Sequence, residues 1–243
     1  MNLHRVQVIL VETSHPGNIG AVARAMKTMC LERLVLVNPA HFPHSEAIAR
    51  ATGAVDVLER AQVVDNLADA LMGCQLVIGA TARQRGMSAP VLEPRECATL
   101  ATSQAEQVEV AVVFGRERSG LHNKETDQCN FLVRIPTNPA FSSLNLAAAV
   151  QVLTYELHLA ARSSQTSTMQ QDSVQLAPAD EMARLYHHLE HVLLTTGFLD
   201  PTNPRLIMRR LRRLFNRAQP DQREVNILRG ILTSVQQALR HPS

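Results

Sequence analysis

Long apolar runs and aromatic side chains are scarce in this chain of 243 residues. The longest apolar run near the start, Val8–Val11, is too short for a membrane span or a signal sequence, so we expect a soluble cytoplasmic protein. Tryptophan is absent and aromatic residues make up 3% of the chain. This scarcity disfavours the class of RNA-binding sheet that stacks bases on exposed aromatic rings.

Closely spaced cysteines are also missing. Four cysteines lie far apart, with neither a CxxC pair nor the Cys/His spacing of a metal site: Cys30, Cys74, Cys97 and Cys129. We therefore expect buried thiols in a reducing compartment, with no disulfide and no metal.

Lysine is nearly absent, because 22 of the 24 basic residues are arginine. Arginine offers a planar, permanently charged fork that suits phosphate. The net charge is only +2, but the segment 205–217 contains no acidic residue and six arginines: Arg205, Arg209, Arg210, Arg212, Arg213 and Arg217. This local density predicts contact with nucleic acid.

Residues 1–162 alternate short β-branched runs with helical patterns. Several of the runs are apolar at consecutive positions, as in strands that are covered on both faces. The runs are Val6–Val11, Leu34–Val37, Leu76–Ile78, Val110–Phe114 and Phe131–Ile135. They predict an α/β domain with a mostly parallel sheet.

The remainder of the chain divides into a linker and a helical region. Residues 163–177 are polar and lack helical periodicity, which predicts a linker. Residues 178–243 form a small helical domain with expected helices at Met182–Leu193, Pro204–Arg217 and Val225–Val235, interrupted by Gly197 and Pro220. Such a small bundle is expected to need a partner surface.

The segment Glu12–Gly20 joins the first strand to a helix. A loop there exposes backbone N–H groups and a positive helix end to an anion. It is neither a dinucleotide fingerprint nor a P-loop, because Gly17 and Gly20 give only G-x-x-G. Arg24 can share a face with the loop mouth. The alternative is that Asn18 caps the helix and Arg24 is a solvated surface charge.

A second loop directly follows the buried strand Val110–Phe114. Gly115 and Gly120 bracket a charged stretch, which indicates unusual backbone torsions or a ligand close by. An ion pair of Glu117 with a neighbouring arginine is the alternative, and the spacing does not separate the two.

A third segment opens the alanine-rich helix that runs to about Ala161. Ser142 or Ser143 is a conventional N-cap, but Asn145 is a poor helix former in the first turn and stays unexplained by capping. Polar side chains at this helix start, facing the other two loops, predict a ligand pocket.

Together the three segments resemble the SPOUT superfamily of S-adenosyl-L-methionine-dependent RNA methyltransferases, in particular its tRNA/rRNA ribose 2′-O-methyltransferases. The resemblance rests on Asn18, Gly20, Arg24, Gly115, Glu117, Gly120, Ile135, Pro136, Ser143 and Asn145. Residues 11–15, 25–29 and 37–39 and the arginine-rich C-terminal segment further resemble the bacterial branch that acts on cytidine or uridine at tRNA position 32. A nicotinamide oxidoreductase is disfavoured, because no dinucleotide fingerprint is present.

The resemblance implies a deep trefoil knot, an obligate homodimer and a reaction that needs no metal. It implies that the cofactor lies against Ala80, Thr81, Phe114, Gly115, Glu117, Gly120, Ile135, Pro136 and Leu144. It implies that tRNA is the partner and that six arginines contact it: Arg83, Arg85, Arg209, Arg210, Arg212 and Arg213.

The resemblance also implies five catalytic residues. Arg24 would clamp the developing alkoxide, Asn18 would orient Arg24 or the ribose, and Ser143 and Asn145 would arrange the nucleophile. Glu117 would hold the partner subunit's loop or an arginine. The family's tyrosine before the paired serines is Phe141 here, so that hydroxyl is missing. The open alternatives are another tRNA or rRNA site, and a non-catalytic RNA-binding scaffold.

Overall fold

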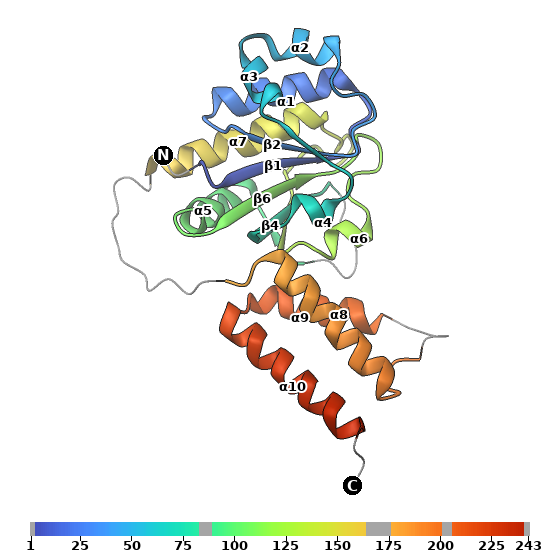
Figure 1. The fold of residues 1–243 in the computed structure, drawn as a ribbon. Coiled ribbons are helices and arrows are strands. Elements are labelled where there is room, and N and C mark those ends of the chain that lie inside the picture. Colours follow the sequence, from blue (N-terminus) through green and yellow to red (C-terminus); the bar gives the residue numbers. More distant parts are fainter. Residues whose placement is uncertain (1–2, 83–88, 164–175, 201–205, 241–243) are drawn as a thin grey trace.

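The structure is a computed structural model that describes residues 3–82, 89–163, 176–200 and 206–240. Its centre is a sheet of parallel strands in the order β3-β2-β1-β6-β4-β7-β5 (Figure 1). The strands are β1 (Val6–Val11), β2 (Arg33–Val37), β3 (Gln62–Val64), β4 (Cys74–Ala80), β5 (Val91–Leu92), β6 (Glu109–Phe114) and β7 (Phe131–Val133). The predicted α/β class with a parallel sheet is confirmed.

The central strands are continuous apolar runs because both faces of the sheet are covered. Every residue of β1 is buried, and alternate side chains enter two different cores. The larger core lies under α1 (Pro16–Thr28), α5 (Pro94–Gln104) and α7 (Leu146–Ser163). The other face is covered by two four-residue helices, α4 (Leu67–Ala70) and α6 (Asn123–Thr126), and in part by the C-terminal helices.

The remaining helices of the sheet region lie between β2 and β3. They are α2 (Ser45–Ala51), the 3₁₀ turn η1 (Thr52–Ala54) and α3 (Val55–Glu59), and α2 packs against α1. Gly20 allows this packing, because a Cβ on it would lie 2.1 Å from the Ala47 carbonyl oxygen. This glycine therefore has a reason in helix packing that does not involve a ligand.

Three C-terminal helices form a separate small core. They are α8 (Ala179–Thr195), α9 (Ile207–Ala218) and α10 (Gln222–Arg240), packed around Leu185, Tyr186 and Val225. The predicted helical region is confirmed, although each helix starts or ends a few residues from its expected bounds. Figure 1 shows these helices on the side of the sheet that carries α4 and α6.

Polar contacts attach the helical region to the sheet. Arg209 Nε lies 2.7 Å from an Asp127 carboxylate oxygen. The buried Asn216 donates to the carbonyl oxygens of Asp127 and Cys129 at 3.1 and 3.4 Å and accepts from the Tyr186 hydroxyl at 2.6 Å. The division of the chain at 1–162, 163–177 and 178–243 stays a prediction, as does the trefoil knot, and most of the predicted linker, residues 164–175, lies outside the described residues.

The cysteine prediction is correct for three residues and wrong for one. Cys74, Cys97 and Cys129 are buried, and burial raises the pKa of each thiol to about 12, which keeps it protonated. Cys30 is exposed, because it follows the end of α1 in a turn with a left-handed φ of 62°. Within the described ranges, no helix is long and apolar enough to cross a membrane, and no group of His, Cys, Asp and Glu has metal-site geometry.

Candidate active site

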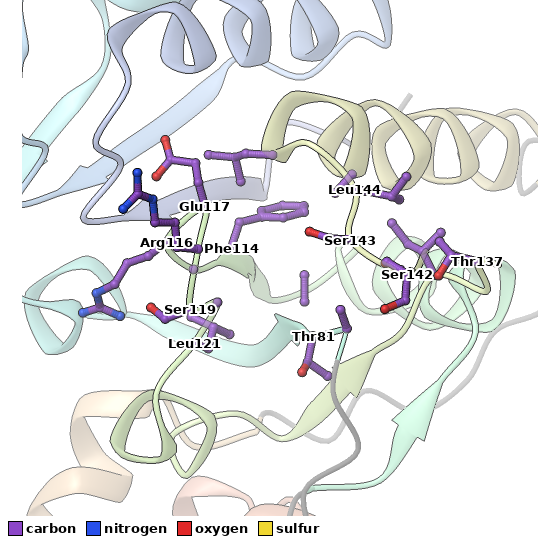
Figure 2. A pocket seen from close by; sticks show the side chains of 18 of the residues that line it. Thr81, Phe114, Arg116, Glu117, Ser119, Leu121, Thr137, Ser142, Ser143 and Leu144 are labelled. Carbon is purple, nitrogen blue, oxygen red and sulfur yellow. Dashed lines mark hydrogen bonds between the residues drawn. The ribbon is translucent and has the colours of Figure 1, made fainter. Parts of the chain in front are cut away.

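A cavity of about 240 Å³ opens at the carboxyl edge of the sheet. It forms there because β6, β4 and β7 are neighbours and parallel, so that the loops after them emerge side by side. The segment before α7 closes the remaining side. Figure 2 shows Thr81, Phe114, Ser143 and Leu144 around this space.

Most of the predicted cofactor-binding residues line this one cavity. They are Ala80, Thr81, Phe114, Gly115, Glu117, Gly120, Ile135 and Leu144, and the predicted catalytic Ser143 lines it too. Pro136 is exposed and is not among the lining residues, although its neighbours Ile135 and Thr137 are. The predicted residues that line the cavity thus come from four separate stretches of the chain: 80–81, 114–120, 135 and 143–144.

The glycines of the 115–120 loop are explained by the turn that they form. Gly120 has a φ of +66°, and its N–H donates to the Arg116 carbonyl oxygen at 2.8 Å. A Cβ on Gly115 would lie 2.1 Å from the Gly120 carbonyl carbon. The chain thus doubles back on itself at one wall of the cavity, which only glycine permits at these two positions.

Glu117 joins this loop to the segment after β1. Its carboxylate accepts hydrogen bonds from the N–H and hydroxyl of Ser14 at 3.1 Å each, from the His15 N–H at 3.2 Å and from the Asn18 amide at 3.0 Å. Partial burial acts to raise the pKa of Glu117, but the hydrogen bonds from Asn18 and the backbone outweigh it and lower the pKa. The side chain is therefore a carboxylate whose lone pairs are already occupied.

These contacts correct one expectation about Glu117. The alternative of an ion pair with a neighbouring arginine is wrong, since Arg116 binds Glu12 and Glu125 instead. The expectation that Glu117 holds the partner subunit's loop or an arginine stays a prediction. In this chain it holds the chain's own segment 14–18.

Asn18 and Asn145 connect the first and third segments. The Asn145 side-chain amide nitrogen Nδ2 donates to the Asn18 side-chain oxygen Oδ1 at 3.1 Å, while the Asn145 Oδ1 accepts from the Ala147 N–H at 2.9 Å. Asn145 is therefore the residue that caps α7, and the expectation that a serine does so is wrong. Asn18 is not a cap either, because the His15 ring nitrogen accepts from the Gly17 N–H at 3.1 Å at the start of α1.

Three of the predicted catalytic residues, Arg24, Asn18 and Asn145, are not among the residues that line the cavity. Arg24 lies on α1 with an exposed side chain, is not a lining residue, and has no hydrogen bond or ion pair with the residues that the structure describes. One chain therefore does not bring Arg24 into the cavity. The predicted RNA-binding residues Arg83 and Arg85 lie outside the described residues.

The arginines of α9 have two different environments. Arg209 is bound by Asp127, and the Arg212 guanidinium lies 4.9 Å from the centre of the Tyr186 ring. Arg210 and Arg213 are exposed, as is Arg217 one turn further on. Their helical spacing places these three on one solvent face, while Arg209 and Arg212 help to dock the helix.

Sequence reasoning missed three residues that build the site. Arg116 lines the cavity and binds Glu12 and Glu125. All three residues are charged and lie in or next to the segments 12–20 and 114–121. The clustering of charged residues at the ends of strands was the feature of the sequence that could have pointed to them. The pairing itself depends on the tertiary fold.

Two family models match this chain. The model described as the SpoU rRNA Methylase family matches residues 5–155, and the model described as the C-terminal domain of the tRNA methyltransferase TrmJ matches residues 180–243.

Curated relatives match along nearly the whole chain. The tRNA (cytidine/uridine-2′-O-)-methyltransferase TrmJ of Photorhabdus laumondii is 54% identical over 235 residues, which cover 96% of this chain and 98% of that protein. The tRNA (cytidine/uridine/adenosine-2′-O-)-methyltransferase TrmJ of Pseudomonas aeruginosa is 52% identical, with 98% and 96% of the two chains covered.

Solved structures agree with the same architecture. TrmJ from Z. mobilis ZM4 superposes with a TM-score of 0.83 at 34% identity and covers 95% of this chain and 98% of that chain. A probable methylase family protein from Haemophilus influenzae gives a TM-score of 0.66 at 39% identity, with 98% of both chains covered.

Proposed function

This chain belongs to the SpoU rRNA methylase family, and from that premise we propose that it transfers a methyl group from S-adenosyl-L-methionine to a ribose 2′-hydroxyl of cytidine or uridine in tRNA. The names of the TrmJ relatives support the tRNA substrate. The observation that carries the proposal is that the ends of β4, β6 and β7 and the segment before α7 line one cavity, while Glu117 and Asn145 join it through Asn18 to the segment after β1. Position 32 of the anticodon loop is the proposed target, on the strength of the sequence resemblance.

The residues of the cavity fit the proposed cofactor. Its volume of about 240 Å³ approaches the roughly 300 Å³ at which ligand sites usually begin. Phe114, Ile135 and Leu144 offer apolar surface for an adenine ring, and Thr81 and Ser142 offer polar groups. S-adenosylmethionine supplies a methyl group on a positively charged sulfur, which needs no metal to be transferred. The chain's own task is to bind, orient and exclude water.

The remaining difficulty of the reaction is the nucleophile, an alcohol that is almost fully protonated at neutral pH. Glu117 is a poor base, because its lone pairs are occupied and its pKa is lowered. A guanidinium is a poor base too, since its pKa exceeds about 12. We therefore assign Arg24 to electrostatic stabilisation of the developing alkoxide, and the proton to an RNA phosphate or a polar neighbour.

The three remaining polar residues position the reacting groups. Asn18 and Asn145 hold each other through their amides, so Asn145 fixes the start of α7 relative to the 14–18 segment. The exposed Ser143, two residues before Asn145, is thereby held at the cavity and is available to the ribose. Glu117 acts as a positioning residue for the same segment.

We also propose that the chain works as a homodimer in the cytoplasm, where tRNA is modified. Phe141 is 79% exposed and Leu144 is also exposed just before α7, and Tyr155 is exposed in the middle of that helix, so large apolar side chains lie open to a partner. Arg24 lies outside the cavity of its own chain, so a single chain presents an incomplete catalytic set. Sedimentation velocity at micromolar concentration tests the proposal, and a monomer would contradict it.

For RNA binding we propose the exposed Arg210 and Arg213 of α9. We also propose Arg83 and Arg85, on the strength of the sequence resemblance. Arg209 and Arg212 serve the docking of α9, so their contribution to RNA binding is indirect. An arginine-rich solvent face beside the catalytic region gives a polyanion a second point of attachment.

A tRNA transcript with a 2′-deoxyribose at position 32 tests the substrate and the site together. The unmodified transcript is expected to accept a radiolabelled methyl group from S-adenosylmethionine, and the deoxy transcript to accept none, because its nucleophile is missing. Equal labelling of both would move the target to another tRNA site. Labelling of ribosomal RNA alone would favour the rRNA alternative, and RNA binding without any transfer would favour a scaffold.

A further inference from the structure

Arg116 forms the densest set of charged contacts at the cavity. Its Nε and Nη2 atoms lie 2.8 and 2.6 Å from the two Glu12 carboxylate oxygens. Its Nη1 and Nη2 atoms lie 3.1 and 2.9 Å from the two Glu125 oxygens. The guanidinium thus binds each carboxylate through two oxygens, a geometry that fixes direction as well as distance.

The two carboxylates belong to elements that are distant in the sequence. Glu12 follows β1 in a left-handed conformation, with a φ of 47°, and its N–H donates to the Val37 carbonyl oxygen at 2.8 Å. Glu125 belongs to α6, where its carboxylate also accepts from the His122 N–H at 2.6 Å. Arg116 therefore ties the end of β1, the loop after β6 and α6 together at one point.

This tie lies next to the residue that organises the catalytic segment. The Arg116 carbonyl oxygen closes the 115–120 turn at the cavity wall, and Glu117 reaches in another direction to Ser14, His15 and Asn18. Arg118 shows that position in the loop is not enough: it is exposed and has no hydrogen bond or ion pair with any described residue. Both arginines that flank Glu117 line the cavity, but among the described residues only Arg116 is bound by carboxylates.

We propose that Arg116 is a positioning residue for the methyl transfer: by holding Glu12 and Glu125, it fixes the 115–120 loop as a cavity wall and aims Glu117 at the 14–18 segment. The inference rests on the proposed function. Without the guanidinium, two carboxylates that shared one cation would face each other unpaired, and their repulsion would open the wall. Both the cofactor affinity and the turnover rate would then fall.

Three variants test the inference on the full-length protein. Arg116→Ala removes both ion pairs, and Arg116→Lys keeps the charge but loses the planar guanidinium that binds two carboxylates. Glu125→Gln removes the negative charge of one partner. We expect Arg116→Ala to raise the dissociation constant for S-adenosylmethionine, measured by calorimetry, about tenfold and to lower kcat about tenfold. We expect Arg116→Lys and Glu125→Gln to fall between this variant and the wild type, with little change in the KM for tRNA.

Arg60 provides a matched control. It too contacts two carboxylates, with Nη2 2.8 Å from Asp56 and Nη1 3.5 Å from Glu32, but it lies just before β3, at the edge of the sheet away from the cavity. Arg60→Ala is expected to shift the unfolding temperature without changing cofactor affinity or kcat. The same pattern in Arg116→Ala, a lower unfolding temperature with both constants within twofold of wild type, would overturn the inference.

The remaining outcomes also separate the two proposals. If Arg116→Ala does not fold, Glu125→Gln decides, because it keeps the arginine and an almost isosteric partner. A wild-type protein that binds no S-adenosylmethionine would contradict the proposed function itself. A wild-type protein that binds and transfers normally, beside variants that do the same, would contradict only the role of Arg116.

Discussion

The loops around the cavity and the C-terminal helices use polar side chains in opposite ways. Around the cavity, Glu117 accepts four hydrogen bonds and Arg116 binds two carboxylates, so the polar groups hold one another. In α9, Arg210 and Arg213 point to solvent. A small ligand is bound best by groups that are fixed beforehand, whereas a long polyanion is met by charges that are free to pair with it.

Arg24 and Arg118 depart from this division, because both are exposed and unpaired among the described residues of the sheet region. We expect Arg24→Ala to lower kcat several hundredfold, which is typical of removing one group that stabilises developing negative charge. Cofactor affinity, measured by calorimetry, should stay within about twofold, since Arg24 does not line the cavity. Turnover equal to wild type would remove Arg24 from the reaction.

Replacing Glu117 tests whether the mutually bonded polar side chains around the cavity hold its loops in place. Glu117→Ala leaves the Ser14 and His15 N–H groups and the Asn18 amide without their acceptor, so the 14–18 segment loses its position. We expect kcat/KM for tRNA to fall about a hundredfold, with a smaller loss in Glu117→Gln, which keeps one acceptor oxygen. Steady-state kinetics on both variants measure this. A loss below threefold in Glu117→Ala would show that the segment is held by other contacts.

Replacing the exposed arginines of α9 tests whether unpaired charges on this helix bind tRNA. Replacing Arg210, Arg213 and Arg217 together by alanine should reduce the salt dependence of tRNA affinity, lowering the slope of log K against log salt by about 2 to 3. Filter binding between 50 and 200 mM salt measures the slope. Arg209→Ala is the control, because its guanidinium is bound to Asp127, and it should lower the unfolding temperature and leave the slope unchanged. Equal changes of slope in the two variants would contradict the distinction between arginines that bind tRNA and an arginine that docks α9.

The smallest expected effect is the pH dependence of stability from Glu117. Its pKa is lowered in the folded protein, so it stabilises the fold above the ordinary glutamate pKa of about 4.3 and loses this effect as the pH falls through the folded pKa. The difference in unfolding free energy between wild type and Glu117→Gln should be constant above about pH 5 and shrink at lower pH. Urea unfolding at a series of pH values measures it, and a difference that grows with acid would contradict the assignment.

The predictable parts of the fold are those that depend on local patterns. The continuous apolar runs of β1 and β6 were sufficient for both strands, because a central parallel strand is buried on both faces. β3 and β5 span three and two residues at the edges of the sheet, too few for any periodicity. Their existence depends on the neighbouring strands, β2 and β7.

The cavity was predicted better than the bonds within it. Glycines and polar residues at strand ends mark a site, since the ends of neighbouring parallel strands share an edge. Which groups bond to each other is a tertiary property: Arg116 is next to Glu117 in sequence but binds Glu12, 104 positions away. Asn145 similarly both caps α7 and binds Asn18, and a one-dimensional pattern gives no ranking of such partners.

The short helix α6 has a consequence for building chimeras of this protein. At Glu125 it is bound by Arg116 of the cavity wall, and at its end Asp127 is bound by Arg209 of α9. A graft that brings other C-terminal helices onto this sheet would need a residue that binds Asp127 as Arg209 does. A cut made between α7 and α8 separates Asp127 from Arg209 and does not supply that residue. The natural unit for exchange is therefore the C-terminal helices together with residues 122–130.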